Sequence, residues 1–340
     1  MPKTRFIVTG AAGFIGSRLL ETLAARYPAE ALLAVDHPIT AEKKPNLAVA
    51  PGVAFLGHHD FLKALESGKL SPEIIFHMGA CSSTTESNWA YLTENNIEYS
   101  QRLWTWCATH GRRLIYASSA ATYGDGEKGF DDEQPIDRLL PLNLYGKSKH
   151  DFDLWIEAQL AAGQPKPAQW AGLKFFNVFG PGESHKGRMA SMVYHGWHQI
   201  HAQGFVRLFK SHKEGYADGG QLRDFISVGD VVNVMLALAD RPASSGLFNL
   251  GTGRASSFRE LIEALFAALG RAPRIEYIPM PEDLRGKYQY FTEATMRKIV
   301  AAGVPYTPTP LAAAVADYAR WLNAQYPDVP AKAAAQRSTP

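Results

Sequence analysis

Three residues near the middle of the chain have types and spacing that could move a proton on and off an alcohol. The stretch YASSAATYG places Ser119 after the apolar run LIYA, and YGKSK places Tyr145 and Lys149 four residues apart. Residues i and i+4 share one face of a helix, and an ammonium beside a phenol lowers the pKa of the phenol. A serine ending a neighbouring strand could hydrogen-bond the same substrate oxygen. Ser119 is therefore interpreted as a hydrogen-bonding partner and not as a nucleophile.

Oxidation of an alcohol needs a hydride acceptor, and the start of the chain predicts one. RFIVTG is typical of a strand and AAGFIGSRLLETLAARY of a helix, with Gly10, Gly13 and Gly16 at the turn between them. Such glycines permit the turn, the approach of a pyrophosphate and close packing of the helix. The helix N-terminus then offers N–H groups to the phosphates. The pattern predicts a dinucleotide site.

The residues after the second predicted strand leave the choice between NAD and NADP open. ALLAVD ends in Asp36, about twenty residues beyond the glycines, where an acid would bind a ribose hydroxyl. That carboxylate favours NAD, because it repels a 2′-phosphate. His37, Lys43 and Lys44 follow directly, and a cation there could pair with a 2′-phosphate.

The elements that must position these residues follow one another as alternating strands and helices. Further strands are predicted over EIIFHMGACSS, RRLIYASS and LKFFNVFGP, and helices over NNIEYSQRLWTWCATHG, YGKSKHDFDLWIEAQLAAG and FRELIEALFAALG. This alternation predicts an α/β fold, a Rossmann doubly wound parallel sheet with a smaller C-terminal α/β substrate domain. The polar, glycine-rich KSHKEGYADGGQL is predicted to be a surface loop.

Composition excludes several other classes of protein. The chain has 340 residues, a formal net charge of +2, 46% hydrophobic residues and two cysteines. No basic block indicates nucleic acid or an anionic membrane, and no window approaches the ~20 apolar residues of a membrane span. Two cysteines make a disulfide framework improbable. We expect a cytoplasmic protein without nucleic-acid or membrane partners and without a metal.

The motifs together resemble a known group of enzymes. TGAAGFIG, YASSAATYG, YGKSK, RDFISVGDVV and FNLGTG are similar to the extended short-chain dehydrogenase/reductase superfamily. Within it, ACSSTTE, GPGESHKGRMAS and IEYIPMPEDLRGKYQYFT resemble the ADP-L-glycero-D-manno-heptose 6-epimerase family. This resemblance implies NADP-dependent epimerisation of an ADP-heptose substrate at C6″ through a transient ketone. It further implies heptose supply for the lipopolysaccharide inner core and a homo-oligomer, specifically a homopentamer.

The resemblance also implies a division of the chain and a role for individual residues. An NADP-binding Rossmann domain is expected over 1–176, joined by about 225–251, and a substrate-binding domain over 177–224 and 252–330, with a frayed tail over 331–340. The catalytic set implied is Ser119, Tyr145, Lys149 and, as a second acid/base group, Lys186. The cofactor contacts implied are Gly10, Gly13, Phe14, Ile15, Gly16, Asp36, His37, Lys43, Met78, Gly79, Ala80, Cys81, Ser82, Asn95, Tyr145, Lys149, Val178 and Lys186. The substrate contacts implied are Ser119, Asn177, Arg188, His195, Phe209, Arg223 and Tyr288.

The sequence departs from the family pattern in two places, and three other functions are alternatives. Arg188 stands where the family has a small polar residue, and the loop over 212–220 is longer than usual. A 4,6-dehydratase would carry acids where this chain has Ala120 and Ala121. A nucleotide-sugar 4-epimerase is the alternative enzyme, and a non-catalytic NADP-sensing module is the alternative outside catalysis.

Overall fold

The computed structural model describes residues 4–241, 245–285 and 288–329. Contacts between residues divide the described chain into two compact units. Unit 1 combines the chain up to Phe175 with Val231–Leu250 and Thr295–Tyr306, and unit 2 combines Phe176–Asp230 with Gly251–Ala294 and the chain from Thr307 onward. The predicted ranges put all of 252–330 into the substrate domain, whereas residues 295–306 group with unit 1. The predicted frayed tail lies outside the described residues.

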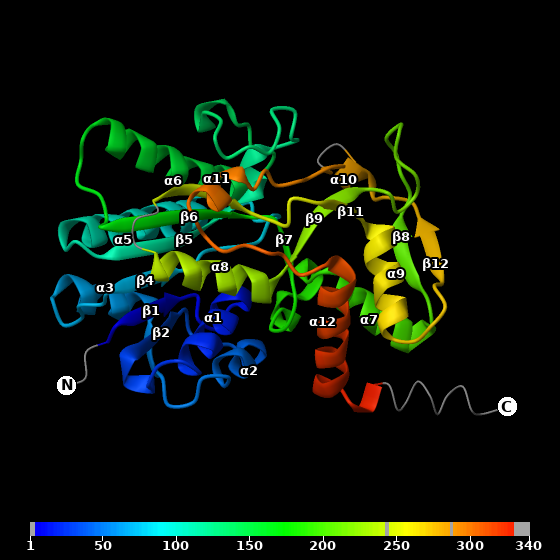
Figure 1. The fold of residues 1–340 in the computed structure, drawn as a ribbon, viewed down its shortest axis with the longest axis horizontal. Helices are drawn as coiled ribbons and strands as arrows, with labels where there is room; N and C mark the ends of the chain where they lie inside the picture. The colour runs from blue at the N-terminus through cyan, green and yellow to red at the C-terminus, as the bar shows by residue number, and fades with distance from the viewer. Residues whose placement is uncertain (1–3, 242–244, 286–287, 330–340) are drawn as a thin grey trace. The chain divides into compact units, whose positions relative to one another are not determined.

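Unit 1 is built on a parallel sheet, as the alternation of strands and helices predicts. Within the described residues this sheet has seven strands in the order β10-β6-β5-β4-β1-β2-β3, and every neighbouring pair is parallel. Figure 1 shows β6, β5, β4, β1 and β2 following one another in that order. The strands are β1 (Phe6–Thr9), β2 (Leu32–Asp36), β3 (Ala54–Gly57), β4 (Ile74–His77), β5 (Arg113–Ser119), β6 (Gln169–Phe175) and β10 (Gly246–Leu250).

The central strands of unit 1 consist of buried, mostly apolar residues. Every residue of β1, β2, β4 and β6 is buried, which is the near-continuous hydrophobic pattern of a parallel sheet with helices on both faces. The edge strand β3 is half exposed. The α-helices of this unit are α1 (Phe14–Ala24), α2 (Lys44–Leu47), α3 (His58–Glu66), α4 (Trp89–Leu92), α5 (Tyr99–Thr109), α6 (Leu144–Ala161), most of α8 (Val228–Asp240) and α11 (Arg297–Ala301).

Short helical turns complete unit 1, and two of them flank the residues of interest. A π-helical turn, Thr93–Glu98, joins α4 to α5, and a 3₁₀ turn, Ala120–Tyr123, follows β5 directly. The remaining 3₁₀ turns are Ala29–Ala31, Ala41–Lys43 and Ile136–Arg138. A π-helical turn inside an α-helix frequently marks a functional site.

Unit 2 contains two small sheets and three longer helices in its described part. One sheet has the order β11-β9-β7 and the other pairs β12 with β8. Its elements are β7 (Asn177–Phe179), the 3₁₀ turn Ser184–Met189, α7 (Met192–Gln203), β8 (Val206–Phe209), β9 (Leu222–Ser227), β11 (Ala255–Ser257), α9 (Phe258–Ala268), β12 (Ile275–Ile278), α10 (Glu282–Arg285) and α12 (Leu311–Gln325). The predicted strand LKFFNVFGP is thus two strands, interrupted at Phe176.

A separate apolar core holds unit 2 together. Trp197 of α7, Leu265 of α9 and Leu322 of α12 are fully buried in one cluster. Helix α9 begins with a capping box, in which the Ser257 hydroxyl accepts from the Glu260 N–H and the Glu260 carboxylate accepts from the Ser257 N–H. This core supports the surface that carries the predicted substrate residues.

Candidate active site

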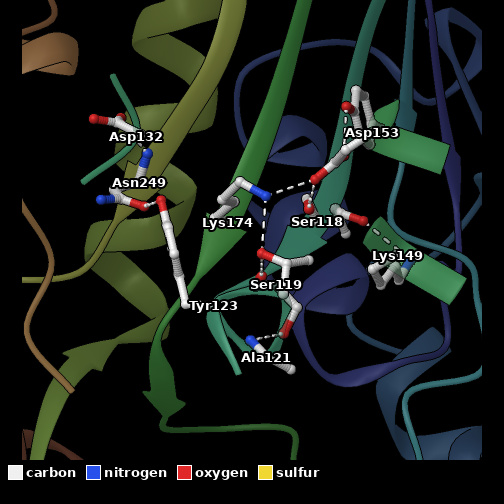
Figure 2. A network of polar contacts seen from close by, with 12 residues as sticks. Ser118, Ser119, Ala121, Tyr123, Asp132, Lys149, Asp153, Lys174 and Asn249 are labelled. Carbon is white, nitrogen blue, oxygen red and sulfur yellow. Dashed lines mark hydrogen bonds and ion pairs between the residues drawn. The ribbon is translucent and has the colours of Figure 1, made fainter. Parts of the chain in front are cut away.

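Unit 1 contains the serine, tyrosine and lysine singled out in the sequence, and Figure 2 shows Ser119 and Lys149. Ser119 is the last residue of β5, and its hydroxyl accepts from the N–H of Ala121 at 3.1 Å. Tyr145 lies in the first turn of α6, which Asn143 caps by accepting from the N–H of Gly146 at 2.8 Å. A side-chain hydrogen bond joins Ser119 to Tyr145. The strand end and the helix thus bring Ser119 and Tyr145 together, and their shared contact with a substrate oxygen stays a prediction.

Lys149 completes this trio, but it does not act on the phenol as predicted. Its side chain is buried, with 5% exposed, and Nζ donates to the carbonyl of Ala117 at 3.0 Å. Burial lowers the pKa of Lys149 to about 8, and the Asp153 carboxylate opposes that effect. Burial raises the pKa of Tyr145, against a smaller lowering by the Ser119 hydrogen bond. The predicted fall of the phenol pKa is wrong for this structure, because desolvation of the phenol is the largest effect.

The glycine turn has the shape that a dinucleotide requires. Gly10 follows β1 with φ +67°, and a Cβ there would lie 2.7 Å from the backbone of Gly79. A Cβ on Gly16 would lie 2.1 Å from the carbonyl oxygen of Gly10. Helix α1 begins after Gly13, which has no side chain to cap it. The cradle accommodates backbone alone, so the residues present fit a pyrophosphate at this helix N-terminus. Phe14 and Ile15 form the first turn of α1.

Asp36 ends β2 as predicted, but its carboxylate is already bound by this chain's own groups. Oδ2 accepts from the N–H of Ala12 at 2.9 Å, and Oδ1 accepts from the N–H of His37 at 2.8 Å. Lys43 Nζ donates to Oδ1 at 3.3 Å. The His37 ring stacks on His58, with centroids 3.7 Å apart. A cation therefore lies beside the acid that the sequence offered to a ribose.

A buried histidine holds the C-terminal ends of the neighbouring strands β1 and β4 together. His77 ends β4, its Nδ1 lies 2.8 Å from the Thr9 hydroxyl, and its Nε2 lies 2.9 Å from the Ser100 hydroxyl. The Ser100 hydroxyl donates to the Asn96 carbonyl, so it accepts from Nε2 and Nδ1 accepts from Thr9. Thr9 Oγ1 in turn accepts from the N–H of Gly79 at 3.1 Å. Burial lowers the pKa of His77 to about 3, which keeps the imidazole neutral.

The loop after β4, which contains Met78, Gly79, Ala80, Cys81 and Ser82, is anchored by a residue that the sequence reading missed. Asn96 Oδ1 accepts from the N–H of Cys81 at 2.8 Å, and Nδ2 donates to the Cys81 carbonyl at 3.1 Å and to the Ser148 hydroxyl at 2.8 Å. Asn96 is fully buried. The predicted contact Asn95 instead donates to the Tyr91 carbonyl at 2.9 Å within its own turn. The doubled asparagine of ENN was the signal for Asn96, and the role of Asn95 as a cofactor contact stays a prediction.

The predicted second base lies in unit 2 on a turn held by a carboxylate. Glu183 is fully buried and accepts from the N–H and the hydroxyl of Ser191, both at 2.6 Å. Its backbone carbonyl accepts from the N–H of Lys186 at 2.9 Å. Burial lowers the pKa of Lys186, and Glu183 opposes that effect. Lys186 is half buried, and a lysine whose pKa is lowered is a candidate general acid or base.

Two predicted substrate residues of unit 2, Arg223 and Phe209, pack against the ring of a third, Tyr288. The Arg223 guanidinium lies 5.0 Å from the centroid of the Tyr288 ring, and the Phe209 ring packs edge-on to the same ring at 6.4 Å. Arg223 lies in β9 and is 7% exposed. Burial lowers the pKa of Arg223, so an anion would be a favourable neighbour for the guanidinium.

The remaining predicted residues of unit 2 lie on separate elements. Asn177 and Val178 belong to β7, Arg188 is exposed on the turn that carries Lys186, and His195 is half buried on α7. Among residues 4–241, 245–285 and 288–329, no group of three histidine, cysteine or carboxylate side chains could hold a metal. Over the same residues, no helix is both long and apolar enough to cross a bilayer.

Comparisons with known proteins agree with this fold. Residues 6–251 match the model of the NAD dependent epimerase/dehydratase family. A protein of Nitratidesulfovibrio vulgaris named ADP-L-glycero-D-manno-heptose-6-epimerase is 48% identical over 93% of this chain and 97% of its own length. One of the same name from Fusobacterium nucleatum is 43% identical over 92% and 96%. The crystal structure of the Helicobacter pylori enzyme of that name superposes with a TM-score of 0.77 at 26% identity, covering 95% and 97% of the two chains.

The parallel sheet and the glycine turn define a dinucleotide-binding fold, and the chain belongs to the NAD dependent epimerase/dehydratase family. Its class of cofactor is therefore a nicotinamide dinucleotide. Within this family the chain is an isomerase of the epimerase type, similar to the ADP-L-glycero-D-manno-heptose-6-epimerases.

Proposed function

We propose that this enzyme interconverts ADP-D-glycero- and ADP-L-glycero-D-manno-heptose at C6″ with NADP as its cofactor. The observation that carries the substrate is the identity of 43–48% to enzymes of that name over most of this chain. The reaction would supply heptose for the lipopolysaccharide inner core, in the cytoplasm. We further propose a homopentamer, which mass photometry of the purified protein would test.

The surroundings of Asp36 support NADP over NAD. An unpaired carboxylate at this position would repel a 2′-phosphate, but Lys43 lies 3.3 Å from Asp36 and offsets its charge. The side chain of Lys43 is still 29% exposed, so its ammonium can reach a second anion. When NADP is bound, Lys43 and His37 would hold the 2′-phosphate, and the backbone around Gly10, Gly13 and Gly16 would hold the pyrophosphate.

The trio of unit 1 supplies the proton transfers of the proposed reaction. The C6″ hydrogen of the heptose is not acidic, so inversion requires oxidation to a ketone. When bound, the nicotinamide supplies acceptance and return of that hydrogen as hydride. The phenolate form of Tyr145 takes the proton of the C6″ hydroxyl, becomes the neutral phenol and later returns that proton. Ser119 donates a hydrogen bond to the C6″ oxygen, and with cofactor and substrate bound the Lys149 ammonium would stabilise the phenolate before it takes the proton.

Lys186 is the proposed acid/base group for the opposite epimer. The two epimers present their hydroxyl groups in different directions, so one phenol cannot easily serve both. The lowered pKa of Lys186 suits such a role. Arg223, Tyr288 and Phe209 are the proposed contacts for the nucleotide part of the substrate, with the guanidinium on a phosphate. Asn177, His195 and Arg188 are the proposed contacts for the heptose.

The substrate and the reaction are tested together by NMR. Purified enzyme is incubated with ADP-D-glycero-D-manno-heptose in D2O, and the configuration and deuterium content at C6″ are followed. We expect the L-glycero epimer to form with protium retained at C6″, because the substrate hydrogen returns to its own carbon. Deuterium at C6″ would contradict the ketone route. Turnover of UDP-glucose to UDP-galactose in place of the heptose would identify a 4-epimerase.

The two acid/base groups are separated by matched substitutions. Tyr145→Phe keeps the ring, and Lys186→Met keeps the apolar stem. Each should slow epimerisation by at least ~10²-fold, the scale typical of one general acid–base group, with cofactor still bound. Each variant should still oxidise or reduce one of the two epimers only. The change in absorbance of the bound nicotinamide after mixing with each epimer would show which one. If Lys186→Met epimerises at the wild-type rate, the second role belongs to another residue.

A further inference from the structure

A buried ion pair in unit 1 lies directly behind the trio. Lys174 of β6 and Asp153 of α6 are fully buried, and Lys174 Nζ donates to Asp153 Oδ2 at 2.6 Å. Burying two charges costs more than their attraction returns unless other hydrogen bonds complete the pair. The Asp153 carboxylate also accepts from the hydroxyls of Tyr116 at 2.9 Å and Ser118 at 2.7 Å. The site is thus a completed polar network inside an apolar core.

The network contacts the turn after Ser119 and the helix that carries Lys149 (Figure 2). Lys174 Nζ also donates to the Thr122 hydroxyl at 2.9 Å, and that hydroxyl donates to the carbonyl of Ser119 at 2.9 Å. This chain of contacts fixes the turn that ends β5. On the helix side, Asp153 follows Lys149 by four residues and so lies on the same helical face.

Strand β5 is held to α6 through the two residues that precede its last residue, Ser119. Ser118 donates to Asp153, and Ala117 accepts from Lys149. The backbone that carries Ser119 is therefore tied to α6, the helix that carries Tyr145. A displacement of the strand end along the helix would break these buried contacts together.

We propose that Asp153 and Lys174 are a positioning pair that holds Ser119 against Tyr145 and provides the counter-charge of Lys149. This inference rests on the proposed function only in treating the trio as the acid–base machinery. Neither residue touches the reacting atoms, so both act through the trio. A purely structural pair would stabilise the fold without influencing the charge on Lys149.

The Asp153 carboxylate favours the charged form of Lys149. Burial lowers the pKa of Lys149 to about 8, and both Asp153 and the Cys81 thiol raise it against that effect. Other titratable groups on the elements around Lys149 are Tyr145 on its own helix, His77 on β4, whose pKa is lowered to about 3, and Lys174 on β6, which is paired with Asp153. Loss of the Asp153 charge should therefore lower the pKa of Lys149 further, and the ammonium form would be lost at a lower pH.

The decisive variant removes both charges at once. Asp153→Asn alone leaves a buried lysine unpaired and is expected to destabilise the fold strongly, whereas replacing both members of a buried pair is often tolerated. The test variant is therefore Asp153→Asn with Lys174→Met. Asp153→Glu keeps the carboxylate and serves as the conservative rescue. Asp151→Asn is the matched control on the same helix, since Asp151 pairs with the half-exposed Lys147 at 2.5 Å.

Two measurements on the full-length protein are needed. The first is the pKa of Lys149 from the NMR titration of [13Cε]-lysine-labelled protein, with the resonance assigned by Lys149→Arg. The second is the pH profile of kcat with ADP-D-glycero-D-manno-heptose. In the double variant the lost Lys174 charge offsets part of the lost Asp153 charge, so we expect the pKa of Lys149 and the alkaline limb of kcat to fall by up to about one pH unit, the scale of one nearby opposite charge. We expect kcat to fall by roughly 10- to 100-fold, the scale of a displaced catalytic group.

The controls separate this proposal from the proposed function. Asp153→Glu and Asp151→Asn should keep the wild-type pKa of Lys149. If wild-type enzyme does not turn over the heptose, the proposed function fails, and the NMR titration still tests the pair. An unchanged pKa of Lys149 in the folded double variant overturns the proposal, whatever happens to kcat.

Discussion

The buried His77 should make the stability of unit 1 sensitive to acid. Its imidazole is neutral in the folded protein because burial lowers its pKa from 6.5 to about 3. An unfolded chain binds a proton at His77 below pH 6.5, and the folded chain does not. Stability from this residue is therefore fully present above pH 6.5 and is lost as the pH falls toward 3. Between pH 7.5 and pH 5, linkage with these two pKa values gives a loss of about 2 kcal/mol.

Urea denaturation at pH 7.5 and pH 5 measures this loss. His77→Gln can still hydrogen-bond Thr9 and Ser100 but does not titrate, so its free energy of unfolding should fall by about 2 kcal/mol less than that of wild type. His110→Gln is the control, because His110 is an exposed histidine of the same unit. The reasoning is refuted if His77→Gln and wild type lose the same free energy of unfolding between the two pH values.

Three shorter predictions concern the cofactor and the trio. Gly16→Ala places a Cβ 2.1 Å from the Gly10 carbonyl oxygen, so purified variant should carry much less cofactor in an acid extract than wild type. Lys43→Ala should lose the preference for NADP over NAD by about tenfold, the scale of one charge-assisted contact; equal retention of both cofactors by wild type would contradict this. The kcat of wild type should fall as the pH rises through about 8, where Lys149 loses its proton, and Lys149→Arg should abolish that limb.

The repeated strand and helix signals predicted the fold of unit 1 closely. The expected helix over 145–163 is observed as Leu144–Ala161, and ALLAVD contains the strand Leu32–Asp36. The edge strand Ala54–Gly57 was missed, because a short, half-exposed strand has neither a long apolar run nor clear alternation. The break at Phe176 was also missed, since one continuous apolar run gives no local sign of where the backbone turns.

The candidate site shows a similar division between local and long-range information. Residue types and spacing identified Ser119, Tyr145 and Lys149, because each lies at a strand end or on one helical face. They did not predict that Lys149 would donate to Ala117 or that Lys43 would bind Asp36. Such contacts join segments far apart in the sequence, and only the packed structure decides which donor reaches which acceptor.

Strand β10, the edge strand beside β6 in the sheet of unit 1, is synthesised long after β6. Strand β10 pairs with β6 from Gly246↔Ala171 to Leu250↔Phe175, although about seventy residues of chain separate the two strands. A ribosome that has released only the first 175 residues therefore displays β6 as an open, apolar edge. Until β10 emerges, that edge can pair with another nascent chain. Fragments cut at the apparent end of the Rossmann segment should aggregate, and a soluble nucleotide-binding domain would need residues 231–250 joined back to it.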